Sequence, residues 1–436
     1  MKHIIWNPKM ECADRQTIRE MQLAGVKKAV AYCYERVPYY KKKFDDIGLR
    51  PEHIKTFADV KNIPFTTSDD LKENYPFGLF AVDKKEVVRV HGSSGTTGKP
   101  KIVGYTRRDI DTWSEIVARV ICAAGGTDED IAQISFGYGL FTGGFGLHYG
   151  MEKVGAMVVP VSSGNTERQL MLMQDFCSTI LVSTPAYALY MADTAERLGI
   201  DKSKIKLRLA MFGGEGHTEA MRRQIEKRWN LLATENYGLS EIGGPGYSGE
   251  CYRQEGMHIA DDLFYSEIID PDTLEPLPVG EKGELVITPF CREAMPVLRY
   301  RTKDISWLND EPCACGRHSM RMGKIQGRTD DMLIIRGVNV FPSQIEGVIM
   351  SVREVEPHYE IVVTRENYMD KIEVRVEISN PALLDTFTEL EQLRAKVRQK
   401  LYKTLNIDAK VTFVSAGTLP RFEGKARRVI DKRGQE

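Results

Sequence analysis

Apolar residues recur at two spacings along the chain, and the two kinds of segment alternate. Over 15–44 and 108–124 apolar side chains recur every three or four positions, which is the period of a helix with one buried face. Short apolar runs rich in branched residues lie at 154–161, 179–183 and 206–212, as expected for strands buried in a parallel sheet. The alternation predicts an α/β chain with a mixed, mostly parallel sheet that helices cover on both faces.

The pattern changes near residues 327–331, where a domain boundary is predicted. Beyond it the spacing predicts two strands, a helix and a last strand, at 355–365, 371–378, 384–402 and 410–414. Together they form a small α+β domain of about a hundred residues, within the usual domain size. We therefore predict an N-terminal domain over 1–328, with a small β-rich subdomain at about 245–320, and a C-terminal domain over 331–436.

Composition narrows the class of protein. The 436 residues include 60 Lys and Arg against 61 Asp and Glu, a balance that argues against general attraction to nucleic acids or membranes. No apolar stretch approaches the roughly 20 residues of a membrane-spanning helix. The first residues lack the apolar region of a signal peptide. Eight scattered cysteines do not resemble a disulfide scaffold. We expect a cytoplasmic protein with reduced thiols.

A segment rich in glycine and hydroxyl groups follows the strand predicted to begin at 87–90. Residues 93–100 read Ser-Ser-Gly-Thr-Thr-Gly-Lys-Pro. Glycines let backbone amides surround a phosphate, and Lys99 adds a positive charge. The segment is not a Walker loop, because Pro100 stands where that loop has Ser or Thr and prevents a helix from starting at Lys99. We predict a phosphate-binding loop between two strands; a glycine-rich turn without a ligand is the alternative.

This segment resembles the signature loop of the adenylate-forming superfamily of acyl- and aryl-CoA synthetases. A second run, at 331–342, reads Asp-Met-Leu-Ile-Ile-Arg-Gly-Val-Asn-Val-Phe-Pro and resembles the phenylacetate–coenzyme A ligase family. The resemblance covers nearly the whole chain. It implies that ATP and an aryl acid, with phenylacetate as the leading candidate, form an acyl-adenylate and pyrophosphate. Coenzyme A then takes the acyl group and AMP leaves, while the C-terminal domain is mobile and the protein is a possible homodimer.

The resemblance also implies roles for later residues. Tyr237 would pack on adenine, the hydroxyl of Ser240 would touch the α-phosphate, and Glu241 would hold magnesium through a hard oxygen. Asp304 would bind the ribose hydroxyls, and Arg328 would reach ribose or phosphate. The family usually has Thr at the position of Ser240, and the change keeps the hydroxyl. Taken singly, Glu241 is open to a surface role and Asp304 to a role in a turn.

The remaining implied roles concern catalysis and movement. Lys425 would bridge the attacking carboxylate and the α-phosphate, although by itself it is one more lysine in a basic tail. Asp330 would be the hinge, and Gly337 would let coenzyme A pass the backbone. Catalysis is thus assigned to Lys425, Glu241 and Lys99. The expected cofactor-binding residues are Ser93, Ser94, Gly95, Thr96, Thr97, Gly98, Gly214, Glu215, Asn236, Tyr237, Gly238, Ser240, Asp304, Arg328 and Gly337.

An aromatic segment is the candidate acyl pocket. Between 135 and 145, aromatic rings alternate with glycines, which favours a flat slot for an aromatic acid. Tyr138, Phe141 and Phe145 are the expected lining residues, together with Gly213 at the end of a predicted strand, where open α/β sheets place ligands. The three aromatic residues are equally open to a role as ordinary core residues.

A further set of residues has the composition of a metal site. Cys313 and Cys315 flank one residue, and Cys251 and His258 belong to the same predicted β-rich subdomain. Three Cys and one His form a closed structural zinc set. Unrelated reduced cysteines are the alternative.

The sequence therefore predicts an AMP-forming aryl-CoA ligase that uses ATP, magnesium and coenzyme A and carries a structural zinc. Two alternatives stay open. One is an aryl-acid adenylating enzyme that loads a carrier protein or another nucleophile. The other is a catalytically silent nucleotide-binding homologue, which the joint presence of the predicted catalytic and ATP-binding residues disfavours.

Overall fold

The computed structural model describes residues 4–93, 100–336, 338–366, 369–380, 386–422, 426 and 428–433. The described chain divides into two compact units. The first unit comprises Met1–Ser183, Asp201–Gly214 and Leu231–Lys324, and the second comprises Thr184–Ile200, Glu215–Asn230 and Ile325–Glu436. The predicted boundary between domains, at residues 328–331, remains a prediction.

The first unit begins with helices. They are α1 (Pro8–Glu11), α2 (Arg15–Arg36), α3 (Pro38–Asp45), α4 (Phe57–Val60) and α5 (Ser68–Glu73). Asp14 caps α2 by accepting from the amide of Thr17, as short polar side chains do at helix starts. The helical pattern over 15–44 is divided at Val37, because Pro38 has no amide to continue α2 and instead starts α3.

The large sheet of the first unit has the strand order β13-β14-β9-β8-β7-β6-β5-β3-β4 within the described residues. Strands β4, β3, β5, β6 and β7 run parallel, and pairing becomes antiparallel from β7 to β13. The bounds are β3 (Ile131–Ile134), β4 (Met157–Val159), β5 (Ile180–Ser183), β6 (Leu209–Phe212), β7 (Leu232–Leu239), β8 (Gly244–Glu250), β9 (Met257–Ile259), β13 (Leu308–Asn309) and β14 (Arg321–Met322).

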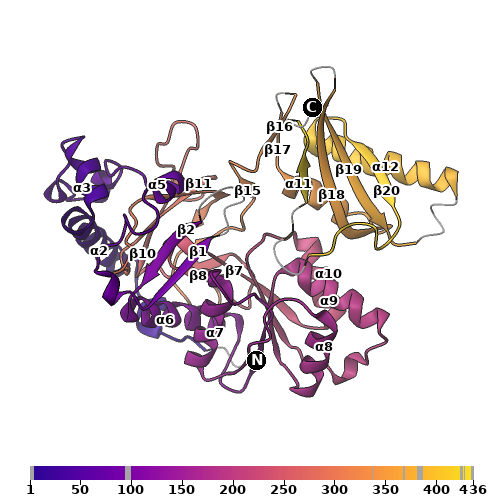
Figure 1. Ribbon diagram of the computed structural model, residues 1–436, viewed down its shortest axis with the longest axis horizontal. Helices are drawn as coiled ribbons and strands as arrows, with labels where there is room; N and C mark the ends of the chain where they lie inside the picture. Colours follow the sequence, from indigo (N-terminus) through magenta and orange to yellow (C-terminus); the bar gives the residue numbers. More distant parts are fainter. Residues whose placement is uncertain are drawn as a thin grey trace. The chain divides into compact units, whose positions relative to one another are not determined.

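Helices pack closely on this sheet. Helix α6 (Arg107–Ala124) contacts β8 and α7 (Thr142–Val154), and the two helices lie together in Figure 1. A Cβ added at Gly150 of α7 would stand 2.3 Å from Val117 of α6, so glycine allows this approach. Helix α8 (Thr166–Asp175) is fastened to β3, because Gln133 donates to the side chain of Gln169 at 2.9 Å.

Two smaller groups of strands complete the first unit. Strands β1 (Arg89–Ser93) and β2 (Lys101–Tyr105) form an antiparallel pair, so the predicted phosphate loop does connect two strands. Strand β11 (Gly283–Pro289) pairs antiparallel with β10 (Phe264–Ile269) on one side and β12 (Tyr300–Ser306) on the other. All three strands lie within residues 245–320, the range predicted for the β-rich subdomain.

The second unit contains a four-stranded sheet in the order β20-β19-β18-β21 within the described residues. Its strands are β18 (Val355–Glu366), β19 (Met369–Ile378), β20 (Lys410–Val414) and β21 (Val429–Asp431). The other elements of the unit are α9 (Pro185–Arg197), α10 (Glu219–Trp229), β15 (Gly327–Arg328), β16 (Leu333–Ile335), β17 (Val338–Val340), α11 (Pro342–Met350) and α12 (Phe387–Leu405).

The hydrophobic core of the second unit lies between this sheet and two helices. Helices α11 and α12 contact each other, and each contacts the sheet (Figure 1). Ile345, Val374 and Val397 are fully buried between them. Strand β21 was not predicted, because three residues after a basic segment carry little periodicity; it is held by parallel pairing with β18.

The architecture confirms the predicted fold class. A large sheet with a parallel half, smaller strand groups and a small α+β unit are all present. In the described part of the chain, no helix is long and apolar enough to cross a membrane.

Candidate active site

The predicted nucleotide-binding residues of the first unit gather at the carboxyl ends of β6 and β7. The turn at Gly213 follows β6, and Asn236 lies in the neighbouring strand β7. The side chain of Asn236 donates to the carbonyl of Phe212 at 2.7 Å. A Cβ added at Gly213 would lie 3.1 Å from the carbonyl oxygen of Asn236. The predicted turn is thus fastened to β7, at the edge where open α/β sheets bind ligands.

The predicted adenine and ribose residues are in direct contact. The hydroxyl of Tyr237 donates to the carboxylate of Asp304 in β12 at 2.5 Å. Burial, followed by the charge of Asp304, raises the pKa of Tyr237 well above its ordinary value, so the phenol keeps the proton that it donates. Residues 67 positions apart therefore form one polar unit. Next to it, a Cβ at Gly238 would lie 2.1 Å from the carbonyl oxygen of Gly244, and only glycine fits there.

The predicted phosphate and magnesium residues lie just after β7. Ser240 and Glu241 form a short 3-10 helix, residues Ser240–Ile242, and both are buried. The hydroxyl of Ser240 is 3.0 Å from that of Thr142 at the start of α7. Glu241 forms an ion pair with Lys101, and the side chains are 5% and 18% exposed. The position of Glu241 is therefore a buried site with an accompanying positive charge.

Lys101 is a residue that the sequence reasoning missed. It directly follows the predicted loop and stands opposite Ser93 in the β1–β2 pairing. The spacing in that pairing places Ser93, Lys101 and Glu241 at one location. The available signal was the lysine immediately after Pro100, to which we assigned no role from the sequence.

Part of the predicted loop lies outside the described residues. Ser93, at its start, is described, and its hydroxyl oxygen is buried without a hydrogen-bond partner among the described residues, which fits a group that accepts a ligand. The predicted residues outside the described part are Ser94, Gly95, Thr96, Thr97, Gly98, Lys99, Gly337 and Lys425.

The aromatic candidates are only partly gathered. The rings of Tyr138 and Phe145 meet edge to face at 5.2 Å, and His91 lies 5.5 Å from Phe145. The hydroxyl of Tyr138 is also 3.1 Å from Nδ1 of His148. Phe141 is 43% exposed, and its ring lies 6.3 Å from that of Phe136. Tyr138 and Phe145 therefore form a cluster beside His91 of β1, and Phe141 packs separately.

Three of the predicted residues that the structure describes belong to the second unit. Arg328 and Asp330 form a two-pronged ion pair at 2.8 and 2.9 Å, so the predicted ribose contact and the predicted hinge residue neutralise each other. Glu215 accepts from the backbone amides of Ala186 and Ala426, each at 2.9 Å. Gly214, its neighbour in sequence, belongs to the first unit and has a φ of +82°, which favours glycine.

The comparisons with known proteins agree over nearly the full length. Residues 41–289 match the AMP-binding enzyme family and residues 337–433 the AMP-binding enzyme C-terminal domain. The chain is 47% identical to a phenylacetate-coenzyme A ligase of Thermus thermophilus, over 99% of this chain and 100% of the relative. It is 48% identical to a phenylacetate-coenzyme A ligase of Aromatoleum evansii, over 98% of this chain and 97% of the relative.

This chain belongs to the phenylacetate–coenzyme A ligase family. A solved structure of 2-hydroxyisobutyryl-CoA ligase, in the postadenylation state with R3-HIB-AMP, is 26% identical with a TM-score of 0.92. The alignment covers 98% of this chain and 92% of that one. The predicted family and fold class are thereby confirmed.

The Cys and His residues form a second cluster, apart from the motifs of the phenylacetate–coenzyme A ligase family. Cys251 follows β8, His258 lies in β9, and Cys313 and Cys315 lie between β13 and β14. One ligand atom from each of the four lies within 4.8 Å of all the others. The sulfurs of Cys251 and Cys313 are 3.9 Å apart, and the Cys315 sulfur is 3.4 Å from Nε2 of His258. The structure thus brings together the four residues that the sequence grouped.

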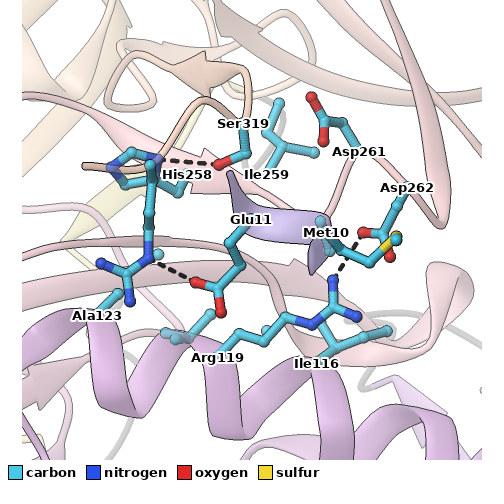
Figure 2. A pocket seen from close by; sticks show the side chains of 15 residues that line it. Met10, Glu11, Ile116, Arg119, Ala123, His258, Ile259, Asp261, Asp262 and Ser319 are labelled. Carbon is cyan, nitrogen blue, oxygen red and sulfur yellow. Dashed lines mark hydrogen bonds and ion pairs between the residues drawn. The ribbon is translucent and has the colours of Figure 1, made fainter. Parts of the chain in front are cut away.

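A small charged pocket lies beside this cluster. Figure 2 shows His258 turned so that Nδ1 meets the hydroxyl of Ser319, at 3.0 Å. Glu11 pairs with Arg317 at 2.5 Å, and Arg119 pairs with Asp262 at 2.7 Å. Arg317 also approaches the Cys315 sulfur at 3.7 Å. The buried charges are paired, as burial in a pocket of this kind requires.

Proposed function

We propose that this protein ligates an aryl acid, with phenylacetate as the first candidate, to coenzyme A at the expense of ATP. The observation that carries the proposal is near-full-length identity of 47–48% to phenylacetate-coenzyme A ligases. The partly buried Tyr237–Asp304 contact and the Glu241–Lys101 ion pair support it, because they provide polar and charged groups at the motifs by which the chain resembles the family. ATP and coenzyme A are the nucleotide substrates of this reaction.

The first half-reaction forms the acyl-adenylate. An oxygen of the acid attacks the α-phosphorus of ATP, and the bond to the leaving pyrophosphate breaks. Most of the catalysis of such a step is positioning and neutralisation of charge. In the proposal, Lys425 neutralises charge between the acid and the α-phosphate, and the loop that begins at Ser93 holds the pyrophosphate with Lys99. Asp304 and Tyr237 hold the adenosine.

Magnesium fits the donor chemistry beside the phosphates. Glu241 offers a buried carboxylate, which is a hard oxygen ligand of the kind that magnesium prefers, and its present partner is a lysine. Bound magnesium would neutralise phosphate charge. Lys101 would then be released from Glu241 to face the phosphate oxygens directly.

The second half-reaction transfers the acyl group. The thiol of coenzyme A attacks the acyl carbonyl, the thioester bond forms, and AMP leaves with the electrons of the broken anhydride bond. We propose that the domain over 331–436 moves about Asp330 between the two half-reactions and that Gly337 admits the pantetheine chain. The resemblance to the family implies this role for Gly337, and glycine suits it because it carries no side chain.

Pyrophosphate exchange tests the proposal most directly. The purified protein, given ATP and a panel of aryl acids, should exchange labelled pyrophosphate into ATP fastest with phenylacetate. Addition of coenzyme A should release AMP and form the thioester. Exchange without coenzyme A-dependent AMP release would favour the carrier-loading enzyme. No exchange with any acid of the panel would favour a silent homologue.

We further propose that Cys251, His258, Cys313 and Cys315 hold a structural zinc ion. Thiolates bound tetrahedrally at about 2.3 Å from zinc stand about 3.8 Å apart, which agrees with the 3.9 Å between Cys251 and Cys313. Four protein ligands close the coordination sphere, so the site is structural rather than catalytic. Nδ1 of His258 contacts Ser319, a usual outer-shell arrangement, so Nε2, which lies 3.4 Å from the Cys315 sulfur, is the nitrogen that would bind the metal.

Metal analysis tests the zinc proposal without reference to activity. Protein purified without chelator should contain one zinc per chain, and Cys313→Ser should lose it. Cys177→Ser is the matched control, because Cys177 is exposed and apart from the cluster. Absence of zinc from the unmodified protein, including after refolding with added zinc, would refute the site.

A further inference from the structure

The side chain of Glu215 connects two parts of the second unit. One of its oxygens accepts from the amide of Ala186 and the other from the amide of Ala426, each at 2.9 Å. Ala186 lies in the first turn of α9, which begins at Pro185, where amides have no partner within the helix. A carboxylate at this position also interacts favourably with the helix dipole. Both carboxylate oxygens are therefore engaged by backbone amides.

The second of these amides lies next to the proposed catalytic lysine. Ala426 directly follows Lys425 in the sequence. Two residues later, Arg428 is fixed in place: its guanidinium lies 4.3 Å from the centre of the Tyr359 ring, and its carbonyl accepts from the amide of Ile361 at 2.7 Å. Strand β21 then continues in parallel pairing with β18. The chain is thus held at Ala426 by Glu215 and from Arg428 onward by the sheet.

The chain is also held on the other side of Lys425. Arg421 forms a two-pronged pair with the fully buried carboxylate of Glu377 at 2.9 and 2.7 Å. The same carboxylate accepts from the amide of Leu419 at 2.8 Å. Of these anchors, the ones at Arg421 and Arg428 join neighbouring parts of the C-terminal sheet. Glu215 differs, because it reaches Ala426 from a segment more than 200 residues earlier.

We propose that Glu215 is a positioning residue for adenylate formation, which holds the backbone at Ala426 so that Lys425 is placed for the first half-reaction. The inference rests on the proposed function, in which Lys425 acts in that step alone. Glu215 is half-buried, and burial raises its pKa, while the two amides and then Arg428 oppose the rise. Its carboxylate is occupied by protein amides, so its contribution is to hold the chain rather than to contact ATP.

The test substitution is Glu215→Gln. Glutamine keeps the size, but its amide group has one accepting oxygen, so one of the two backbone contacts is lost. Pyrophosphate exchange at saturating ATP should fall by about ten- to a hundredfold, the range that misplacement of a reacting group by about an ångström produces. The KM for ATP should stay within about twofold. Thioester formation from supplied phenylacetyl-AMP should stay near that of the unmodified protein.

A double substitution decides whether Glu215 acts through Lys425. In a Lys425→Ala background, Glu215→Gln should cause no further loss of exchange, because residues that act as one unit are not additive. A full additional loss would overturn the proposal. So would a raised KM for ATP with an unchanged maximal rate, which is the result expected of an ATP ligand. Equal loss in both half-reactions would indicate a structural defect and would also overturn it.

Hydrogen exchange provides a readout independent of activity. Peptides that span 418–430 should exchange faster in Glu215→Gln than in the unmodified protein. Glu389→Gln, on the exposed start of α12, is the control and should change neither this exchange nor the half-reactions. Unchanged protection of the peptides would overturn the anchoring role. An incorrect proposed function would give a different result. The unmodified protein would then show no pyrophosphate exchange, whereas the 418–430 peptides would still exchange hydrogen faster in Glu215→Gln.

Discussion

At the scale of single residues, the proposed nucleotide site contains polar groups that are paired and at least partly buried. Tyr237 donates to Asp304, and Lys101 accompanies Glu241. A buried polar group that loses its partner costs more than the net value of the hydrogen bond. Each member of a pair is therefore needed even where only one of them meets the ligand.

The Tyr237–Asp304 pair leads to a prediction for ATP binding. Tyr237→Phe keeps the aromatic face and removes the hydroxyl, so Asp304 loses a donor and is less well placed for ribose. A hydrogen bond to a charged group contributes about 1.5–3 kcal/mol, so the KM for ATP in pyrophosphate exchange should rise about ten- to a hundredfold. Tyr402→Phe, on exposed α12, should leave the KM unchanged. An equal rise in both variants would show that the hydroxyl has no specific role.

At the scale of elements, charged side chains add contacts between neighbouring strands whose backbone pairing is short, such as β19 and β20. Glu373 in β19 accepts from Thr412 of β20 at 2.6 Å and pairs with Lys410 of β20 at 2.9 Å. Burial alone would raise its pKa, but these donors and Arg375 outweigh burial and lower the pKa of Glu373 to about 2. The contact therefore stabilises the charged form in the folded state.

This shift predicts how stability depends on pH. Because the folded-state pKa of Glu373 lies below the unfolded value of about 4.3, the contact contributes fully above that value and is lost as the pH falls toward about 2. Glu373→Gln should lower the free energy of unfolding by roughly 2 kcal/mol at pH 7. Urea unfolding should show the difference between variant and unmodified protein shrinking below about pH 4. A difference that grows in acid would contradict the assignment.

The proposed zinc site predicts a separation of stability from chemistry. It joins the end of β8, strand β9 and the turn between β13 and β14. Cys313→Ala should lower the melting temperature by several degrees, as loss of a structural metal does. The KM for ATP, measured below that temperature, should stay near normal. A variant that melts normally but has lost adenylation would contradict a purely structural role.

At the scale of the whole molecule, one chain has to serve two reactions. A positive charge near the α-phosphate is needed for adenylation, whereas thiol transfer needs access for coenzyme A. The proposed solution is alternation of the C-terminal domain, with Lys425 used in one arrangement and Gly337 in the other.

Opposite effects of two substitutions would support alternation. Lys425→Ala should lower adenylate formation by about two decades, as loss of a positioned charge does, and spare thioester formation from supplied phenylacetyl-AMP. Gly337→Leu should leave pyrophosphate exchange intact and block thioester formation. Both half-reactions would be followed separately, adenylation by pyrophosphate exchange and thioester formation by the loss of the free thiol of coenzyme A. Impairment of the same half-reaction by both substitutions would exclude alternation.

Local composition by itself determined much of this protein. Periodicity placed β20 at its observed bounds and α6 to within one residue, because the spacing of apolar residues depends only on neighbours in sequence. The turn of Gly213 and the loop beginning at Ser93 were recognisable for a similar reason, since their glycine and hydroxyl content reflects local backbone needs. The family motifs are also continuous stretches, so the family followed from sequence.

Tertiary structure alone decided which distant residues meet. The partnership of Lys101 with Glu241 depends on the register of β1 and β2, and the engagement of Glu215 with Ala426 joins segments far apart in the chain. The pairing of β21 likewise depends on β18. The physical reason is the same in each case. A buried charge or amide pairs with whichever group the fold brings close to it, and the local pattern of residues in the sequence does not reveal which distant group that is.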